Sequence, residues 1–421
     1  MPFDQCVEEY RKRLAETPRP FLLARRFIAD ESWTKATTQD GTRYVGVFRE
    51  YEPDLAAVLK HQHVLVLGEP GAGKSTTAQA VMCHVIDNGT NHDIPVFAEL
   101  KSYQVNLREL LSTNTPASVL DNKALYRTYI LDGVDEVPRD HRASFQQDVR
   151  DLMANDKNAK IVLTSRQAYA AQHPDALPAG LTAYHLLDFD RKDIKAYAAK
   201  HGADPDVFLA AVRHAQCEEE ITNPFVLHVM LQRYQEHGHL SPIRSDNVGY
   251  VIDRLINSRP LINAQRQRRA LRMLAAACET AARNELTIQE AHRVLIEAID
   301  FPPANADQLA TQLLDELSHS ILIQTSAGIS FQMRSYGEYL AAEELHDKGI
   351  DRLRELAFSG DVAIDTWQNA ITYLAEMNGK VRQYFARHRP RWLITVSPAA
   401  FDEAERTELT KELLREMNGA G

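Results

Sequence analysis

A nine-residue stretch, residues 68–76, constrains what this chain can fold into more than any other part of the sequence. It fits the pattern GxxxxGK[ST] at every position, follows an apolar run at residues 64–67 and opens a helical segment that reaches about residue 86. Glycines in such a loop let successive N–H groups point at a phosphate, and the start of the helix adds a partial positive charge. The residues expected at a nucleotide's phosphates are Gly68, Glu69, Pro70, Gly71, Ala72, Gly73, Lys74, Ser75 and Thr76.

Two side chains of this loop have separate expected roles. Lys74 reaches the outer phosphates, and Ser75 offers its hydroxyl to Mg²⁺. A glycine-rich turn that matches by chance is the alternative. The strand before the loop and the helix after it favour phosphate binding.

Short apolar runs alternate with helical segments in this part of the chain, at residues 64–67, 94–100, 128–131, 161–164 and 182–187. This alternation predicts an α/β P-loop NTPase domain, in which helices cover both faces of a parallel sheet. Residues 94–100 follow the loop helix and precede the strand that ends at Asp132. We therefore expect an extra strand between the P-loop strand and the acid-bearing strand, an order typical of many ATPases.

The run at residues 128–131 ends in a group of acids, Asp132, Asp135 and Glu136. A carboxylate at the carboxyl end of a buried strand beside a phosphate loop is suited to Mg²⁺, so Asp132 is the second expected metal ligand after Ser75. Either Asp135 or Glu136 would orient or deprotonate the attacking water. An acidic, solvated turn is the structural alternative.

Arg166 follows the next apolar strand. A guanidinium matches phosphate oxygens in geometry and charge, so Arg166 is a candidate sensor of the γ-phosphate. An ordinary surface arginine after a strand is the alternative.

The composition limits which partners and which cellular location we expect for this chain. The chain has 48 basic and 58 acidic residues and a net charge of −10, whereas a general polyanion binder is usually basic. The stretch 254–272 holds six arginines and no acid, but an exposed basic helix face explains it better than a nucleic-acid site. Four scattered cysteines, no secretory signal and no apolar run of about 18 residues favour a cytoplasmic protein with no membrane segment.

Residues 64–345 resemble the NACHT clade of signal-transduction ATPases with numerous domains, the STAND NTPases, and within it bacterial NACHT defence proteins. Beyond the loop and the acid box, the resemblance rests on Thr164-Ser165-Arg166, on the box at residues 223–227 and on the box at residues 331–342. It implies ATP or ADP with Mg²⁺ as cofactors and places Pro224 near the adenine. The family's second box usually has a histidine that contacts the ADP β-phosphate, and here that position is Met333, next to Arg334.

The resemblance also implies an order of domains. We expect a mixed lead-in (residues 1–60), the nucleotide-binding domain (61–187), a small helical domain (188–245), a winged-helix domain (246–346) and a C-terminal helical segment (347–421), the last as a possible start of an α-solenoid or sensor. Before the loop, the pattern predicts a charged helix at 7–15 and a strand at 44–48. Neither end carries a catalytic motif, so we expect a minimal switch that recruits its effector or part of a longer protein.

The resulting main hypothesis is a molecular switch that binds ATP, hydrolyses it slowly, and opens and self-associates when a trigger and ATP·Mg²⁺ are present. The trigger, protein or nucleic acid, and the effector are unknown. The resemblance implies a role in innate immunity or defence against phage. Two alternatives are an AAA-like ATPase that remodels a partner with steady turnover and a nucleotide-gated scaffold that does not hydrolyse ATP.

Overall fold

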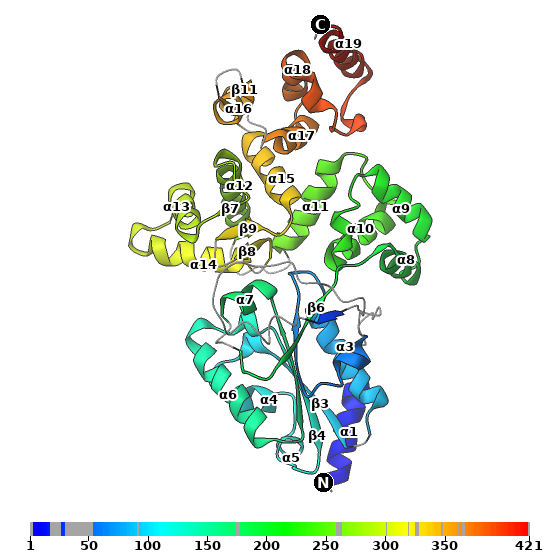
Figure 1. Ribbon diagram of the computed structural model, residues 1–421, viewed down its shortest axis with the longest axis vertical. Coiled ribbons are helices and arrows are strands. Elements are labelled where there is room, and N and C mark those ends of the chain that lie inside the picture. The colour runs from blue at the N-terminus through cyan, green and yellow to red at the C-terminus, as the bar shows by residue number, and fades with distance from the viewer. Residues whose placement is uncertain are drawn as a thin grey trace. The chain divides into compact units, whose positions relative to one another are not determined.

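A computed structural model describes the chain as two compact units, residues 1–189 and 190–421 (Figure 1). The described residues are 3–16, 27–29, 54–90, 92–173, 177–257, 263–299, 301–318, 320–324, 328–346, 348–359, 362–363 and 367–419. The strand predicted at residues 44–48 lies outside them. Each unit is described by itself.

The first unit is built on a six-stranded sheet in the order β1-β6-β2-β5-β4-β3. The strands are β1 (Phe27–Ala29), β2 (His63–Leu67), β3 (Asp93–Glu99), β4 (Tyr126–Asp132), β5 (Ala159–Ser165) and β6 (Thr182–Leu186). All neighbouring pairs among β2 to β6 are parallel. The five predicted strands and the mostly parallel sheet are therefore confirmed.

The position of one strand differs from the prediction. The strand between β2 and β4 in the sheet is β5, and β3 lies at the edge beyond β4. An extra strand does lie between the P-loop strand and the acid-bearing strand, but it is β5 and not residues 94–100. Strand β5 follows β4 in sequence, because crossover connections let chain order and sheet order differ. The sequence reading also missed β1, a three-residue strand that pairs antiparallel with β6 through Phe27 and Leu186.

Helices cover both faces of this sheet, as its apolar strands require. The helical elements are α1 (Phe3–Glu16), α2 (Leu55–Val58), α3 (Lys74–Asn88), η1 (Leu100–Ser102), α4 (Leu107–Ser112), α5 (Ala117–Leu120), η2 (Val134–Glu136), η3 (Arg139–His141), α6 (Arg142–Asn155) and α7 (Gln167–Gln172). Side chains alternate along β2: Leu65 and Leu67 join the core that includes α6, whereas Val64 and Val66 join the core that includes α3. The central strands are thereby fixed between two apolar layers.

The second unit is mainly helical. Its helical elements are α8 (Arg191–Lys200), α9 (Pro205–His214), η5 (Glu220–Thr222), α10 (Pro224–His237), α11 (Arg244–Asn257), α12 (Ala264–Thr280), α13 (Ile288–Ala298), η6 (Pro303–Asn305), α14 (Ala306–Ser318), α15 (Arg334–His346), α16 (Gly349–Ala357), α17 (Gln368–Met377), α18 (Gly379–His388), η8 (Pro390–Leu393), η9 (Pro398–Ala400) and α19 (Glu403–Gly419). A three-stranded antiparallel sheet, in the order β7-β9-β8, contains β7 (Glu285–Leu286), β8 (Leu322–Gln324) and β9 (Ile329–Phe331). The remaining strands form a short pair, β10 (Phe358–Ser359) and β11 (Val362–Ala363). Strands β8 and β9 pair antiparallel through Leu322 and Phe331.

The arginine-rich stretch is not simply an exposed basic face. Arg268 on α12 donates to Glu343 on α15 at 2.9 Å, and Arg272 pairs with Glu344 at 3.0 Å. These partly buried ion pairs connect two helices that pack together. Two of the six arginines thus stabilise the fold through acids some seventy residues away.

A buried arginine is central to the packing of β4. The Arg127 side chain is 4% exposed, pairs with Asp156 at 2.6 Å, and donates to the carbonyls of Val119 and Leu120 at 3.3 and 3.1 Å. A further bond goes to the carbonyl of Asn122 at 2.5 Å. One guanidinium therefore satisfies several buried acceptors between α5 and β5.

Replacing this side chain tests its contribution. We expect Arg127→Met to destabilise the first unit by about 3 kcal/mol, because one partly buried carboxylate and several carbonyls lose their donor. For a unit of this size the loss corresponds to a fall in Tm of roughly 6–12 °C by circular dichroism. Arg108→Met, which removes an exposed pair with Asp121, is the control and should change Tm by no more than about 4 °C. Equal shifts for the two variants would contradict the assignment.

Candidate functional site: a phosphate loop beside an acid turn

The phosphate loop has the predicted strand–loop–helix form. Gly71 and Gly73 have φ values of 76° and 89°, which side-chain-bearing residues rarely adopt, and Gly73 caps the N-terminus of α3. The Gly68 N–H donates to the Ser165 carbonyl at 3.2 Å and so ties the start of the loop to β5. The loop thus lies at the carboxyl ends of β2 and β5.

Lys74 lies across this loop. Its ammonium donates to the carbonyls of Gly68 and Glu69 at 2.9 and 3.2 Å. Burial lowers the pKa of Lys74, and nearby carboxylates, Asp135 foremost, oppose that shift. Because an ammonium has three N–H donors, phosphate oxygens that engage more than one of them replace a carbonyl partner.

Glu69 adds a charge that the motif does not specify. Its Oε2 atom is buried and has no hydrogen-bond partner among the described groups. Burial raises the pKa of Glu69, and the charges of Lys74 and Arg166 counteract that rise. This carboxyl group therefore lies close enough to both cations to interact with their charges.

The expected metal ligands come together. Ser75 is the second residue of α3, and its hydroxyl hydrogen-bonds to Asp132 at the end of β4. Burial raises the pKa of Asp132, whereas its bonds to Ser75 and Thr164 lower it. A hydroxyl and a carboxylate are hard oxygen donors of the kind that Mg²⁺ prefers, with further positions filled by phosphate oxygens and water. These two side chains fit such an ion.

Thr164 is a positioning residue that the sequence reading named only as part of a box. It is fully buried on β5, accepts the Gly133 N–H at 2.9 Å and donates its own proton to Asp132 Oδ1 at 2.5 Å. Because the hydroxyl has one proton, accepting from Gly133 directs that proton to the carboxylate. A polar residue at the end of a buried strand next to the acid strand was the available clue.

Asp135 and Arg166 form a buried pair. Arg166 Nε lies 2.7 Å from Asp135 Oδ2, and the Arg166 N–H donates to Asp135 Oδ1 at 3.2 Å. Both oxygens of Asp135 are therefore occupied. Glu136, the next residue on η2, is less buried, and its charge raises the pKa of Asp132. The structure separates two acids that the sequence left equivalent.

The remaining predicted residues lie in the second unit. Pro224 is the first residue of α10, after Asn223, whose side chain accepts the N–H groups of Phe225 and Val226 at 3.0 and 3.4 Å. This is the expected place for a proline, since its missing N–H would have no helical partner. Arg334 follows the half-buried Met333 and pairs with Glu338 at 2.8 Å.

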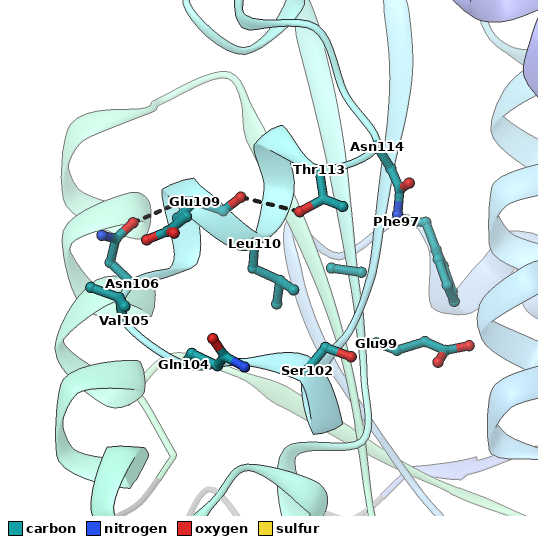
Figure 2. A pocket seen from close by; sticks show the side chains of 11 residues that line it. Phe97, Glu99, Ser102, Gln104, Val105, Asn106, Glu109, Leu110, Thr113 and Asn114 are labelled. Atoms are coloured by element: carbon teal, nitrogen blue, oxygen red, sulfur yellow. Dashed lines mark hydrogen bonds between the residues drawn. The ribbon is translucent and has the colours of Figure 1, made fainter.

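A pocket of about 480 Å³ opens at the end of β3, next to η1 and α4 (Figure 2). Its walls include the carboxylates of Glu99 and Glu109 and the amides of Asn106 and Asn114. No lysine, arginine or histidine is among its described lining residues. Since a phosphate would meet carboxylates there, this pocket is distinct from the nucleotide site.

The described residues contain neither a cluster of metal-ligating side chains nor a membrane-spanning helix. They hold no group of three or more histidine, cysteine, aspartate or glutamate side chains placed to bind a metal. Within the same residues no helix is both long and apolar enough to cross a bilayer.

Together, a phosphate loop between β2 and α3 and an acid turn after β4, a parallel strand of the same sheet, define the class of P-loop NTPases. Residues 49–183 match the family described as nSTAND3, Novel STAND NTPase 3. The chain thus carries a STAND-type P-loop NTPase domain, and the resemblance to the STAND class is confirmed. The narrower NACHT assignment stays a prediction.

No curated protein matches the chain. Among solved structures it is similar to Cdc6p from Pyrobaculum aerophilum, at 14% identity and a TM-score of 0.31 over 67% of this chain and 88% of that one. It is also similar to two mutant forms of RuvB from Thermotoga maritima, at 10% and 12% identity and a TM-score of 0.34, over 65% of this chain and 86% of theirs. TM-scores this low support no inference about the present chain.

The role of Thr164 can be tested with a substitution that removes the hydroxyl and keeps the shape of the side chain. We expect Thr164→Val to raise the Mg²⁺ concentration for half-maximal binding of a fluorescent ATP by about 10- to 100-fold, because Asp132 loses the donor that orients it. Thr164→Ser keeps the hydroxyl and should stay near the unmodified protein. An unchanged midpoint in the valine variant would contradict the positioning role.

Proposed function

We propose that this protein is a molecular switch driven by ATP binding and reset by slow hydrolysis. The observation that carries the proposal is that both cations of the site have protein partners, Lys74 on loop carbonyls and Arg166 on Asp135. A nucleotide whose phosphates bind Lys74 and Arg166 replaces some of these protein contacts with its own. A nucleotide shifts a conformational equilibrium only through such differences in contacts between states, about 5.5 kcal/mol for a complete reversal of populations.

The geometry supports distinct roles for the site residues. Ser75 and Asp132 hold Mg²⁺, and residues 68–76 bind the phosphates. Glu136 is the better candidate for the base that activates water, since both oxygens of Asp135 are engaged by Arg166. Asp135 then acts as the partner that places Arg166 for the γ-phosphate.

In the second unit, the element order α12-β7-α13-α14-β8-β9 with a three-stranded antiparallel sheet supports the winged-helix domain expected at residues 246–346. The small helical domain at 188–245 would present Pro224 to the adenine. Arg334 would replace the family histidine, which Met333 cannot imitate because a thioether has no proton to donate to a phosphate oxygen.

The wider role rests on the family resemblance. We propose that ATP·Mg²⁺ and a trigger lead to opening, self-association and signalling in prokaryotic immune-type defence, in the cytoplasm. Two functions compete with the switch: an ATPase that remodels a partner with steady turnover, and nucleotide gating without hydrolysis. The rate of ATP hydrolysis distinguishes the three.

The nucleotide site is tested by removing its lysine. We expect Lys74→Ala to weaken binding of fluorescent ADP and ATP by roughly 100-fold or more, because the phosphates lose a buried cation. Lys101→Ala, at an exposed lysine of the same unit paired with Glu99, is the control and should bind as the unmodified protein does. Normal affinity in the Lys74 variant would exclude this loop as the site.

The switch itself is tested by separating binding from hydrolysis. Glu136→Gln is expected to lower ATP turnover by about 10²- to 10⁴-fold while ATP-dependent assembly, measured as molecular mass in solution, persists. Asp140→Asn, at an exposed acid four residues further on, should leave both unchanged. Continuous hydrolysis of several ATP per second by the unmodified monomer would instead favour the remodelling ATPase.

A further inference from the structure

One edge of the sheet in the first unit has backbone groups that no described strand pairs. Strand β3 ends the six-stranded order and has β4 as its neighbour on one side only. The carbonyls of Asp93 and Pro95 lie on the open side, because they accept hydrogen bonds from side chains of α1, in the case of Pro95 at 3.2 Å. The carbonyl of His92 instead accepts the Tyr126 N–H of β4 at 2.9 Å. Odd-numbered residues of β3 therefore direct their backbone groups away from β4.

The same alternation places the backbone of Phe97 and the Glu99 N–H on the open side of β3. No described residue outside the sheet donates to or accepts from these groups. Pro95 fits this pattern, since a proline is tolerated in a strand where its missing N–H would face away from the neighbouring strand. An edge strand with unpaired backbone groups is a template for one further strand.

The pocket of about 480 Å³ opens at this part of the edge. Phe97, Ala98 and Glu99 all line it, although successive side chains of a strand point to opposite faces of the sheet. A pocket that reaches three consecutive residues therefore spans the edge between the two faces. Figure 2 shows Phe97 and Glu99 on one side of β3 and the α4 residues Glu109 and Leu110 on the other. The pocket thus lies where an added strand would pair.

The charges around the pocket indicate which kind of segment fits. The lining has the carboxylates of Glu99 and Glu109 and several side-chain amides, and no lysine, arginine or histidine is among its described residues. Glu99 pairs with Lys101 at 2.5 Å, but both side chains are about half exposed, and such exposed ion pairs contribute little free energy. Val105, which is 64% exposed, adds an apolar contact to the lining. A segment with basic residues and apolar neighbours is complementary to this surface.

A second copy of this chain suits the edge less well. Pairing of two β3 edges would bring the pocket carboxylates of both copies toward one another, and like charges on paired strands are destabilising. A basic strand instead points its successive side chains to opposite faces. Two neighbouring basic residues would then meet Glu99 on one side of β3 and Glu109 on the other.

We propose that the open edge of β3 binds an extended, basic segment of a partner protein. The segment adds one strand to the sheet and places neighbouring lysine or arginine side chains on the two sides of the pocket. Backbone hydrogen bonds to Phe97 and Glu99 provide affinity for an extended chain, and the carboxylates of Glu99 and Glu109 select basic residues. This docking site is separate from the phosphate loop and does not depend on the proposed switch.

The experiment uses the full chain and a fluorescein-labelled peptide in which valine and threonine residues flank two adjacent lysines. Binding is measured by fluorescence anisotropy at low salt. The two-lysine peptide is expected to bind at least about tenfold more tightly than the same peptide with two glutamates, because opposite charges across paired strands attract. No binding of the two-lysine peptide at about 1 mM, or equal affinity for the two peptides, would overturn the proposal.

Reversal of one charge on the protein tests where the peptide binds. Glu109→Lys is expected to weaken binding of the two-lysine peptide about tenfold and to strengthen binding of the two-glutamate peptide. Asp151→Lys, at an exposed acid of α6 that does not line the pocket, is the matched control and should change either affinity by less than about twofold. Equal effects of the two variants would show a dependence on net charge alone and would contradict a site at the pocket.

Methylation of the peptide backbone tests whether a strand is added. Methyl groups on the amide nitrogens of alternate residues remove the donors on one side of an extended peptide. One of the two alternately methylated peptides should lose binding and the other should retain it. Equal binding of both would refute strand addition.

Hydrogen exchange locates the paired strand. The amides of Phe97 and Glu99 should exchange more slowly when the two-lysine peptide is bound, whereas those of β1, at the opposite edge of the sheet, should not change. Protection of Phe97 and Glu99 by dimerisation of the chain without peptide would assign the edge to a second copy and overturn the proposal.

Discussion

The hydrogen bonds of Thr164 are the contact on which the nucleotide site depends. One buried hydroxyl on β5 receives the Gly133 N–H and donates to Asp132, and so fixes the acid turn of β4 against the strand next to the phosphate loop. Parallel strands bring their carboxyl ends to one edge of a sheet, but they do not orient the side chains found there. Thr164 supplies that orientation, and Ser75 also hydrogen-bonds to Asp132.

Both cations at this edge of the sheet have protein partners in the structure. Lys74 is bound to carbonyls, Arg166 to Asp135, and the buried carboxyl groups of Glu69 and Asp132 have raised pKa values. Phosphates therefore compete with existing partners instead of entering a preset ring of free cations. Such competition converts nucleotide binding into a change of protein contacts, which is what a switch requires and a permanently assembled catalyst does not.

In the second unit, contacts of charged side chains connect the helices. Its helices are joined by ion pairs between α12 and α15 and by the carboxylate of Glu376 at the start of α11. The ion pairs join α12 to α15 directly, whereas Glu220 Oε2, Arg244 Nε and the Tyr373 hydroxyl are buried and have no partner among the described groups. The second unit thus contains both ion-paired groups and buried polar atoms without a partner among the described groups. One of these atoms belongs to Glu220, which precedes the Asn223–Pro224 turn.

The sequence by itself determined the phosphate loop, the five parallel strands and the acids that follow β4, because these depend on local patterns: a glycine spacing, continuous apolar runs and a carboxylate at a strand end. The spatial order of the strands was decided only by tertiary structure, since nothing local to residues 94–100 or 159–165 says which lies next to β2. Tertiary structure likewise separated Asp135 from Glu136, gave Thr164 its role and supplied acids to Arg268 and Arg272. Each of these outcomes depends on a partner tens of residues away, and folding places such partners through the packing of the whole unit.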